Sequence, residues 1–171
     1  MSQRVTTRGR QEKVARPSPP LSAAQRSPLL TWPRLTRLLC ALIGLGISVY
    51  LSVVHLTTAV KLYCAQNSVV NCESVVTSPS SVVAGIPVAF YGVIWFLVML
   101  ALLTAPSEDR TWRVARLVWA AIGALTVLYL LRTELFVIGA ICIWCTAVHV
   151  LVLLIFGVTV LAPTGAAPEP A

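Results

Sequence analysis

The chain has 171 residues, of which 57% are hydrophobic and only 11% are charged, and its mean hydropathy is +0.84. Soluble domains carry about 25% charged residues, so this composition excludes a soluble enzyme, a coiled coil and a disordered protein. The net charge of +7 is not accompanied by interleaved aromatic residues or glycines, which argues against a nucleic-acid partner. The class that remains is a small polytopic membrane protein.

The N-terminal segment, residues 1–30, mixes Arg, Ser, Pro and Gln without apolar periodicity, so we expect a disordered basic cytoplasmic tail there. The apolar run that follows is too long for a signal peptide. Trp32 and Pro33 are interpreted as the start of the first helix, with Trp32 at the membrane interface. Residues 31–162 are expected to form one transmembrane domain, and residues 163–171 a disordered C-terminal tail.

Four stretches almost free of charge predict four membrane-spanning helices, at residues 38–60, 82–105, 117–131 and 135–162. A helix crosses the hydrocarbon core with about 20 residues. The third stretch reaches that length only with its flanking turns, where the stems of Arg116 and Arg132 can snorkel. The connection near residues 132–134 is very short, so the last two helices should form an antiparallel hairpin. The predicted fold is an all-α bundle of four transmembrane helices.

The distribution of basic residues predicts the orientation of these helices. Eight of the thirteen lie within the first 37 residues and three more lie at positions 110–116. With both termini in the cytoplasm, eleven basic residues are inside and two are outside, as the positive-inside rule requires. The loop at residues 61–81 is then outside and is the only outer connection long enough for a partner site. We expect part of this loop to form a short interfacial helix.

Five cysteines carry the candidate chemistry, and four of them fall on the outer side. Cys64 and Cys72 lie in the outer loop. Cys142 and Cys145 form a C-x-x-C motif in the outer half of the last helix, with Cys142 about 10 Å below the helix end at 1.5 Å per residue. A helix N-terminus favours the thiolate, and a loop pair can relay electrons through mixed disulfides. These pairs predict a redox relay to a lipid-soluble quinone, with Cys40 as a small apolar core residue.

Three other interpretations of the cysteines are open. Two structural disulfides are possible, although a C-x-x-C bridge closes so small a loop that it adds little stability. A zinc site with four thiolates is possible, although the C-x7-C spacing of the loop pair is atypical for one. Haem attachment needs a histidine directly after the C-x-x-C motif, and Thr146 stands there. The redox relay is favoured over all three.

The order Cys64-x7-Cys72, then Ser78, then Cys142-x-x-Cys145 resembles the bacterial membrane form of the vitamin K epoxide reductase family, over about residues 35–160. The resemblance implies a four-helix bundle around a quinone pocket that the outer loop caps. It implies a role similar to that of DsbB, with electrons passing from a separate periplasmic thioredoxin-like (DsbA-like) protein to menaquinone, ubiquinone or vitamin K. It further implies a location in the cytoplasmic (inner) membrane, with the active site on the periplasmic side.

The resemblance also implies roles for single residues. Cys64 would exchange with the partner protein, Cys72 would then exchange with Cys142, and Cys145 would face the quinone. Ser78 matches a serine near the active site of the family, although an ordinary turn residue is an equally good interpretation. We therefore group Ser78 with the four cysteines as candidate catalytic residues.

Four further positions are candidate quinone contacts. His149 stands where family members often carry a tyrosine that donates a hydrogen bond to the quinone, and it shares a helix face with Cys145. Val88 stands where some relatives have an asparagine, so one donor is missing here. Tyr91 lies at the start of the second helix, and Trp144 is interpreted as a pocket wall or an interface anchor. Two more positions, Tyr50 and His55, match the family but could serve only in packing.

The sequence thus predicts a quinone-dependent thiol–disulfide oxidoreductase that supports disulfide formation, with membrane lipid, a quinone and a periplasmic thiol protein as partners and no metal. One alternative is the reduction of vitamin K epoxide or quinone by an external dithiol. Another is a non-enzymatic membrane protein whose cysteines are structural.

Overall fold

The computed structural model describes residues 28–57, 62–64, 67, 69–105 and 109–161. The predicted C-terminal tail at 163–171 lies outside the described residues, as does the predicted N-terminal tail at 1–30 except for its last three residues. Those three already belong to the first helix.

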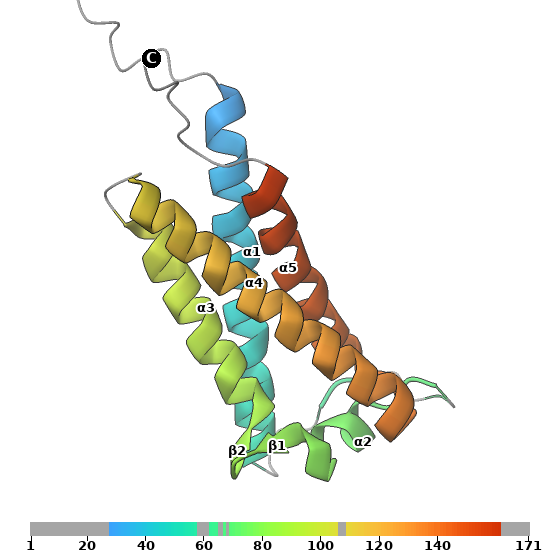
Figure 1. Cartoon of the computed structure of the whole chain (residues 1–171). Helices are drawn as coiled ribbons and strands as arrows, with labels where there is room; N and C mark the ends of the chain where they lie inside the picture. The colour runs from blue at the N-terminus through green and yellow to red at the C-terminus, as the bar shows by residue number, and fades with distance from the viewer. Residues whose placement is uncertain (1–27, 58–61, 65–66, 68, 106–108, 162–171) are drawn as a thin grey trace, which may run out of the picture.

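Four helices form the body of the molecule and lie along one another in Figure 1: α1 (Pro28–Leu56), α3 (Val88–Thr104), α4 (Arg110–Thr133) and α5 (Ile143–Leu161). Helices α1, α4 and α5 are long and apolar enough to cross a membrane, and α3 is a shorter apolar helix of 17 residues. Helix α1 packs against α3 and α5, and α4 packs against α5. The prediction of a four-helix membrane bundle is confirmed.

The first helix begins earlier than expected. It starts at Pro28, so Pro33 lies inside the helix and not at its start. Proline is well tolerated in the first turn because the N–H groups of that turn have no partner within the helix. Pro28 is the proline in that position here. The predicted helix start at Trp32 and Pro33 was therefore wrong by about one turn.

The second transmembrane helix begins later than expected. The first six residues of the uncharged stretch 82–105 form an antiparallel hairpin of two short strands, β1 (Val82–Val83) and β2 (Ile86–Pro87), before α3 starts. Ala84 and Gly85 make the turn with φ values of 52° and 79°. The low charge of residues 82–105 therefore identified a segment of the bundle correctly. The turn at Ala84 and Gly85 is the reason that the first six of these residues are not helical.

The connection before α5 also differs from the prediction. Helix α4 continues into a π turn, η3 (Glu134–Ile138), where the Gly139 N–H donates to the Glu134 carbonyl at 2.9 Å. Gly139 has a φ of 69°, the left-handed conformation that ends helices and suits glycine. The connection is therefore residues 139–142, not 132–134. As a result Cys142 lies immediately before α5, and not about 10 Å inside it.

The loop between α1 and α3 contains two short helical pieces, α2 (Cys72–Val76) and η2 (Pro79–Ser81), so a short helix forms in this loop as predicted. The loop is tied to the connection before α5. The Asn71 N–H donates to the Ile141 carbonyl at 3.1 Å, and the Ile141 N–H donates to the Val69 carbonyl at 3.0 Å. These bonds hold the loop across one end of the bundle (Figure 1).

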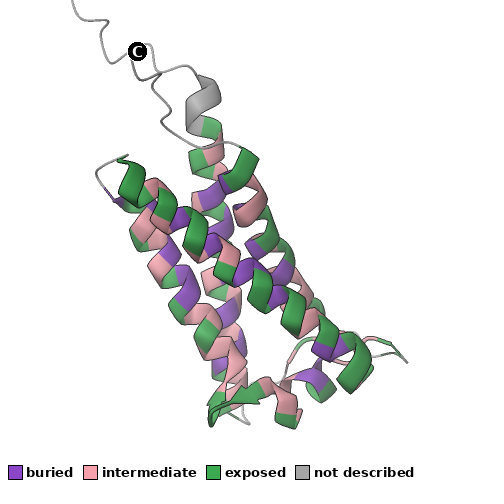
Figure 2. Ribbon diagram, in the orientation of Figure 1, coloured by how far each residue is buried: buried purple, intermediate pink, exposed green. Residues whose placement is uncertain are grey.

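Buried residues recur along each of the four helices (Figure 2). Phe96, Met99 and Ile155 are fully buried at the centre of the bundle, and Cys40 is buried in the same core. Gly44 on α1 lies against the ring of Phe96, which leaves no room for a side chain at that position. Glycine thus permits the close approach of α1 and α3.

We expect Gly44→Ala to lower the free energy of unfolding by about 1–3 kcal/mol, because an added methyl group would overlap the Phe96 ring. Gly46→Ala is the matched control on the same helix, since nothing lies within 4 Å of its added methyl group. That control should be neutral or stabilising by up to about 1 kcal/mol. Thermal unfolding in detergent measures both variants, and equal stabilities would contradict the close approach.

Candidate active site

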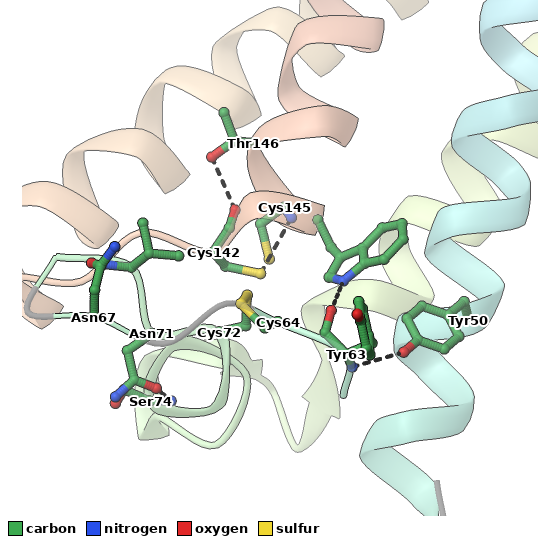
Figure 3. Close-up of a disulfide and its surroundings, with 12 residues drawn as sticks. Tyr50, Tyr63, Cys64, Asn67, Asn71, Cys72, Ser74, Cys142, Cys145 and Thr146 are labelled. Carbon is green, nitrogen blue, oxygen red and sulfur yellow. Dashed lines mark hydrogen bonds between the residues drawn. A yellow bond between two sulfur atoms is a disulfide. The ribbon is translucent and has the colours of Figure 1, made fainter. Parts of the chain in front are cut away.

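Four cysteines from distant parts of the chain meet at one end of the bundle. Cys64 and Cys72 form a disulfide with a Cα–Cα distance of 6.1 Å, while Cys142 and Cys145 are free thiols. Cys72 and Cys142 are fully buried in one small cluster, against which Cys64 and Cys145 also pack. In Figure 3 the Cys142 sulfur points toward the loop disulfide. This arrangement places a thiol beside a disulfide, as thiol–disulfide exchange requires.

The backbone of the C-x-x-C motif is hydrogen-bonded around the Cys142 thiol. The Cys145 N–H donates to the Cys142 sulfur at 3.3 Å, and the Cys142 carbonyl accepts the Thr146 N–H at 2.8 Å. A hydrogen bond from the Cys145 side chain lowers the pKa of the Cys142 thiol from its ordinary value, with help from backbone N–H groups and against the opposing effect of burial. Cys142 is therefore the thiol of the pair that ionises more readily.

We expect Cys145→Ala to raise the pH at which Cys142 becomes reactive, because the hydrogen bond that favours the Cys142 thiolate is lost and burial still opposes ionisation. Cys145→Ser is the matched control, since its hydroxyl can still donate to sulfur, and its midpoint should stay closer to that of the parent. The rate of alkylation of Cys142 against pH, read by mass spectrometry, gives the midpoints. A midpoint that falls in the alanine variant would contradict this account.

Trp144 holds the loop segment that carries Cys64. Its indole N–H donates to the Tyr63 carbonyl at 2.8 Å, and its ring packs on Tyr50 of α1 with centroids 5.3 Å apart. The Tyr63 N–H in turn donates to the Tyr50 hydroxyl at 3.3 Å (Figure 3). Tyr63, the residue before Cys64, is thus hydrogen-bonded to Trp144, the residue before Cys145. Trp144 does not line the apolar cavity beside the thiols, and in the structure it anchors the loop through its bond to Tyr63.

An apolar cavity of about 490 Å³ lies between the helices beside the thiols. Cys145 is part of its wall and Cys142 is not. The volume is within the range of small-molecule sites, which are mostly apolar with a few placed polar groups. The polar or titratable side chains in this wall come from every helix of the bundle, from the loop helix η2 and from the π turn η3, and include Ser48, His55, Ser80, Ser81, Tyr91, Thr126, Tyr129, Thr133, Glu134 and His149. The cavity fits an apolar molecule with few polar atoms.

Three of the four candidate quinone contacts, His149, Val88 and Tyr91, line this cavity. His149 is only 4% exposed, and its Nδ1 atom has no hydrogen-bond partner within the part of the chain that the structure describes. The Tyr91 hydroxyl donates to the Val83 carbonyl at 3.1 Å, which fixes the hairpin to α3. A carbonyl-bearing ligand could provide the partner that the buried imidazole lacks.

Ser78 does not line the cavity. Its hydroxyl accepts the Ser80 N–H at 3.2 Å and caps the short helix η2, and its carbonyl accepts the Ser81 N–H at 2.9 Å. Ser80 and Ser81 are instead the serines in the cavity wall. In the structure, the Ser78 hydroxyl thus caps a turn.

Glu134 is a cavity residue that is not among the site residues predicted from the sequence. It was assigned to the outer connection, yet its side chain is 5% exposed and lines the cavity. The four apolar residues that follow it, Leu135 to Ile138, were a signal that this carboxyl stands within a membrane segment. An ionisable residue in such a segment is a functional candidate by default.

The arrangement of the sulfurs does not support the zinc interpretation. Two of the four sulfurs are bonded to each other and are not thiolates. Among the described residues, no group of three or more His, Cys, Asp or Glu is placed to hold a metal ion.

A helical membrane bundle with a loop disulfide, a free thiol pair and an apolar cavity defines a membrane-embedded thiol oxidoreductase. The sequence model of the vitamin K epoxide reductase family matches residues 35–160, which is most of the chain. The chain therefore belongs to this family, whose members are quinone-reducing thiol oxidoreductases. No curated protein matches the chain.

Proposed function

We propose that the protein passes electrons from a separate thioredoxin-like dithiol protein to a membrane quinone and so supports disulfide formation outside the cytoplasm. One observation carries this proposal: the thiols of the C-x-x-C motif face two different places. Cys142 is buried with Cys72 beside the loop disulfide, whereas Cys145 lines the apolar cavity. A structural cysteine pair has no need of this division, whereas a relay requires it.

In the proposed cycle, the thiols of the partner protein first reduce the Cys64–Cys72 disulfide. Cys72 then attacks the oxidised C-x-x-C pair at Cys142, which forms a Cys72–Cys142 disulfide and releases the Cys145 thiolate. Attack by Cys64 on Cys72 restores the loop disulfide and leaves Cys142 as a thiol. The pair of thiols is finally oxidised by the quinone, which takes up two electrons and two protons. A loop disulfide with two free thiols matches the stage before that last step.

The cavity supports the choice of a quinone as the electron acceptor. Its wall is mostly apolar, and its volume of about 490 Å³ suits a planar ring. We assign to His149 the donation of a hydrogen bond to a quinone carbonyl, because its buried Nδ1 atom has no partner in the described structure. Val88 and Tyr91 would line the ring. These contacts do not distinguish menaquinone, ubiquinone and vitamin K, which share the dicarbonyl ring.

We further propose that the cysteine end faces the periplasm and that both termini lie in the cytoplasm, in the cytoplasmic (inner) membrane. A second, smaller pocket lies on Arg37 of α1 and on Arg110, Arg113 and Arg116 of α4. These residues belong to the helix ends opposite the loop (Figure 1). The positive-inside rule puts such a cluster in the cytoplasm, which leaves the disulfide on the oxidising side.

The proposal is tested with the full chain in lipid nanodiscs, a thioredoxin-like dithiol protein, and either a soluble menaquinone or vitamin K epoxide. We expect quinone reduction to be coupled one-to-one to oxidation of the partner, and to be faster than epoxide reduction. Faster turnover of the epoxide would support the alternative reaction driven by an external dithiol. An absence of turnover with every dithiol would support structural cysteines.

A further inference from the structure

Quinone reduction by a dithiol requires proton transfer as well as electron transfer. Oxidation of two thiols to one disulfide releases two protons from sulfur, and a quinone that becomes a quinol takes up two protons on oxygen. Cys145 lies at an apolar cavity, where few groups can carry a proton. A side chain that holds and releases a proton is therefore needed near both the sulfur and the quinone oxygen.

Glu134 has the position that this role requires. It is buried and lines the cavity together with Cys145 and His149. It is the only carboxyl in the cavity wall among the residues that the structure describes.

The π turn is the feature that directs this carboxyl inward. Glu134 is the first residue of η3, and the next three residues, Leu135, Phe136 and Val137, are 54%, 82% and 63% exposed. The polar side chain is thus inside while its apolar neighbours are outside. Burying a carboxyl costs free energy that an apolar residue would not, so packing alone does not explain its presence. π turns of this kind are frequent at functional sites.

Other titratable groups face the same cavity and belong to any account of its pH dependence. They come from each packed helix: His55 from α1, Tyr91 from α3, Tyr129 from α4, and Cys145 and His149 from α5. Both tyrosines are exposed. Among the described residues of the cavity wall, Glu134 is the one that is both buried and a carboxyl.

We propose, on the basis of the proposed function, that Glu134 takes the proton of the Cys145 thiol and delivers it to a quinone oxygen. The S–H bond of Cys145 breaks, an S–S bond forms with Cys142, and two electrons pass to the quinone. One new O–H bond takes its proton from Glu134, which returns to its starting state. The proton of Cys142 is released to water at the loop, and the second quinone oxygen takes a proton from water, so atoms and electrons balance.

The first test compares the pH profiles of quinone reduction. Glu134→Gln should lower the rate by about 10²-fold near pH 7 and flatten the profile, because the amide cannot carry a proton. Glu134→Asp keeps a carboxyl and should recover part of the rate. Asp109→Asn makes the same chemical change at an exposed residue that precedes the opposite end of α4, and this variant should behave as the parent does. If thermal unfolding shows that Glu134→Gln is not folded, the pH profile of Glu134→Asp is used for the test.

The second test needs no quinone. Infrared difference spectra are recorded between the dithiol and disulfide states of Cys142 and Cys145, with a soluble disulfide as the oxidant. A carboxyl band should appear for the parent and for Asp109→Asn, and should be lost in Glu134→Gln. A parent rate and an unchanged carboxyl band in Glu134→Gln would overturn the role of Glu134 and leave the proposed function standing. A parent protein that reduces no quinone would overturn the proposed function, while the infrared test would still show whether Glu134 responds to the thiols.

Discussion

Replacement of Cys145 by alanine is expected to lower the rate of quinone reduction by at least about 10³-fold, a loss typical of removing an attacking nucleophile. The reason is positional, because Cys145 is the cysteine in the wall of the cavity while Cys142 lies behind it. The assay follows quinol formation by absorbance with a protein dithiol and with a small dithiol. Quinone reduction should be lost with both donors, because Cys145 acts after the step at which either donor reduces the protein.

Two controls keep this result specific. Cys40→Ala removes a thiol that is buried in the bundle core and does not line the cavity, and its rate should stay within about twofold of the parent. In Cys145→Ala the Cys64–Cys72 disulfide should still be reduced by the partner protein, which shows that the loop remains folded. Quinone reduction by Cys145→Ala at the parent rate would remove Cys145 from the proposed relay.

Replacement of Cys64 by alanine is expected to block turnover with the thioredoxin-like protein by at least about 10²-fold, because the loop then has no disulfide to exchange with the partner. Quinone reduction driven by a small dithiol should persist, since such a dithiol can reduce Cys142 and Cys145 directly and can also reduce a disulfide between Cys72 and Cys142. The remaining loop thiol, Cys72, is buried in one cluster with Cys142. A Cys72–Cys142 disulfide should therefore accumulate, because the thiol that would resolve it is missing.

Mass spectrometry of the Cys64→Ala protein, trapped at low pH without reductant, identifies this bridge. Cys72→Ala is the matched control, because it also removes the loop disulfide but cannot form a bridge from position 72. A bridge from Cys72 to Cys145 in place of Cys142 would contradict the division of roles within the C-x-x-C motif. Equal turnover of Cys64→Ala with both donors would show that the loop disulfide takes no part in the reaction with the partner.

The sequence predicted the family and the bundle because both depend on local properties. Long uncharged runs identify membrane helices wherever they fold, and the order of Cys64, Cys72, Cys142 and Cys145 can be read directly from the chain. The ends of the helices were harder to predict from the sequence. An uncharged run reports which residues belong to the bundle but not which of them are helical, so the hairpin before α3 and the extension of α4 to Ile138 were missed.

Prediction of the site residues from the sequence has the same limit. Cys145 and His149 were placed together by their spacing on one helix, and both line the cavity. Ser78, six residues after Cys72, is a candidate because it matches a serine of the family, yet it caps η2 while Ser80 and Ser81 line the cavity. In a tight turn, a shift of two residues changes the direction of a side chain. Distance along the chain alone therefore cannot identify the serine that faces the cavity.

Composition, charge and cysteine order by themselves determined that this is a four-helix membrane protein with two cysteine pairs, since these properties require no contact between distant residues. Tertiary structure alone decided that Cys142 lies beside the loop disulfide while Cys145 lines the cavity, and that Glu134 points inward. These facts depend on where α4 ends, on the left-handed Gly139 and on the packing of the loop against α5. The direction of a side chain is set by such packing between separate elements, which no single segment of the sequence contains.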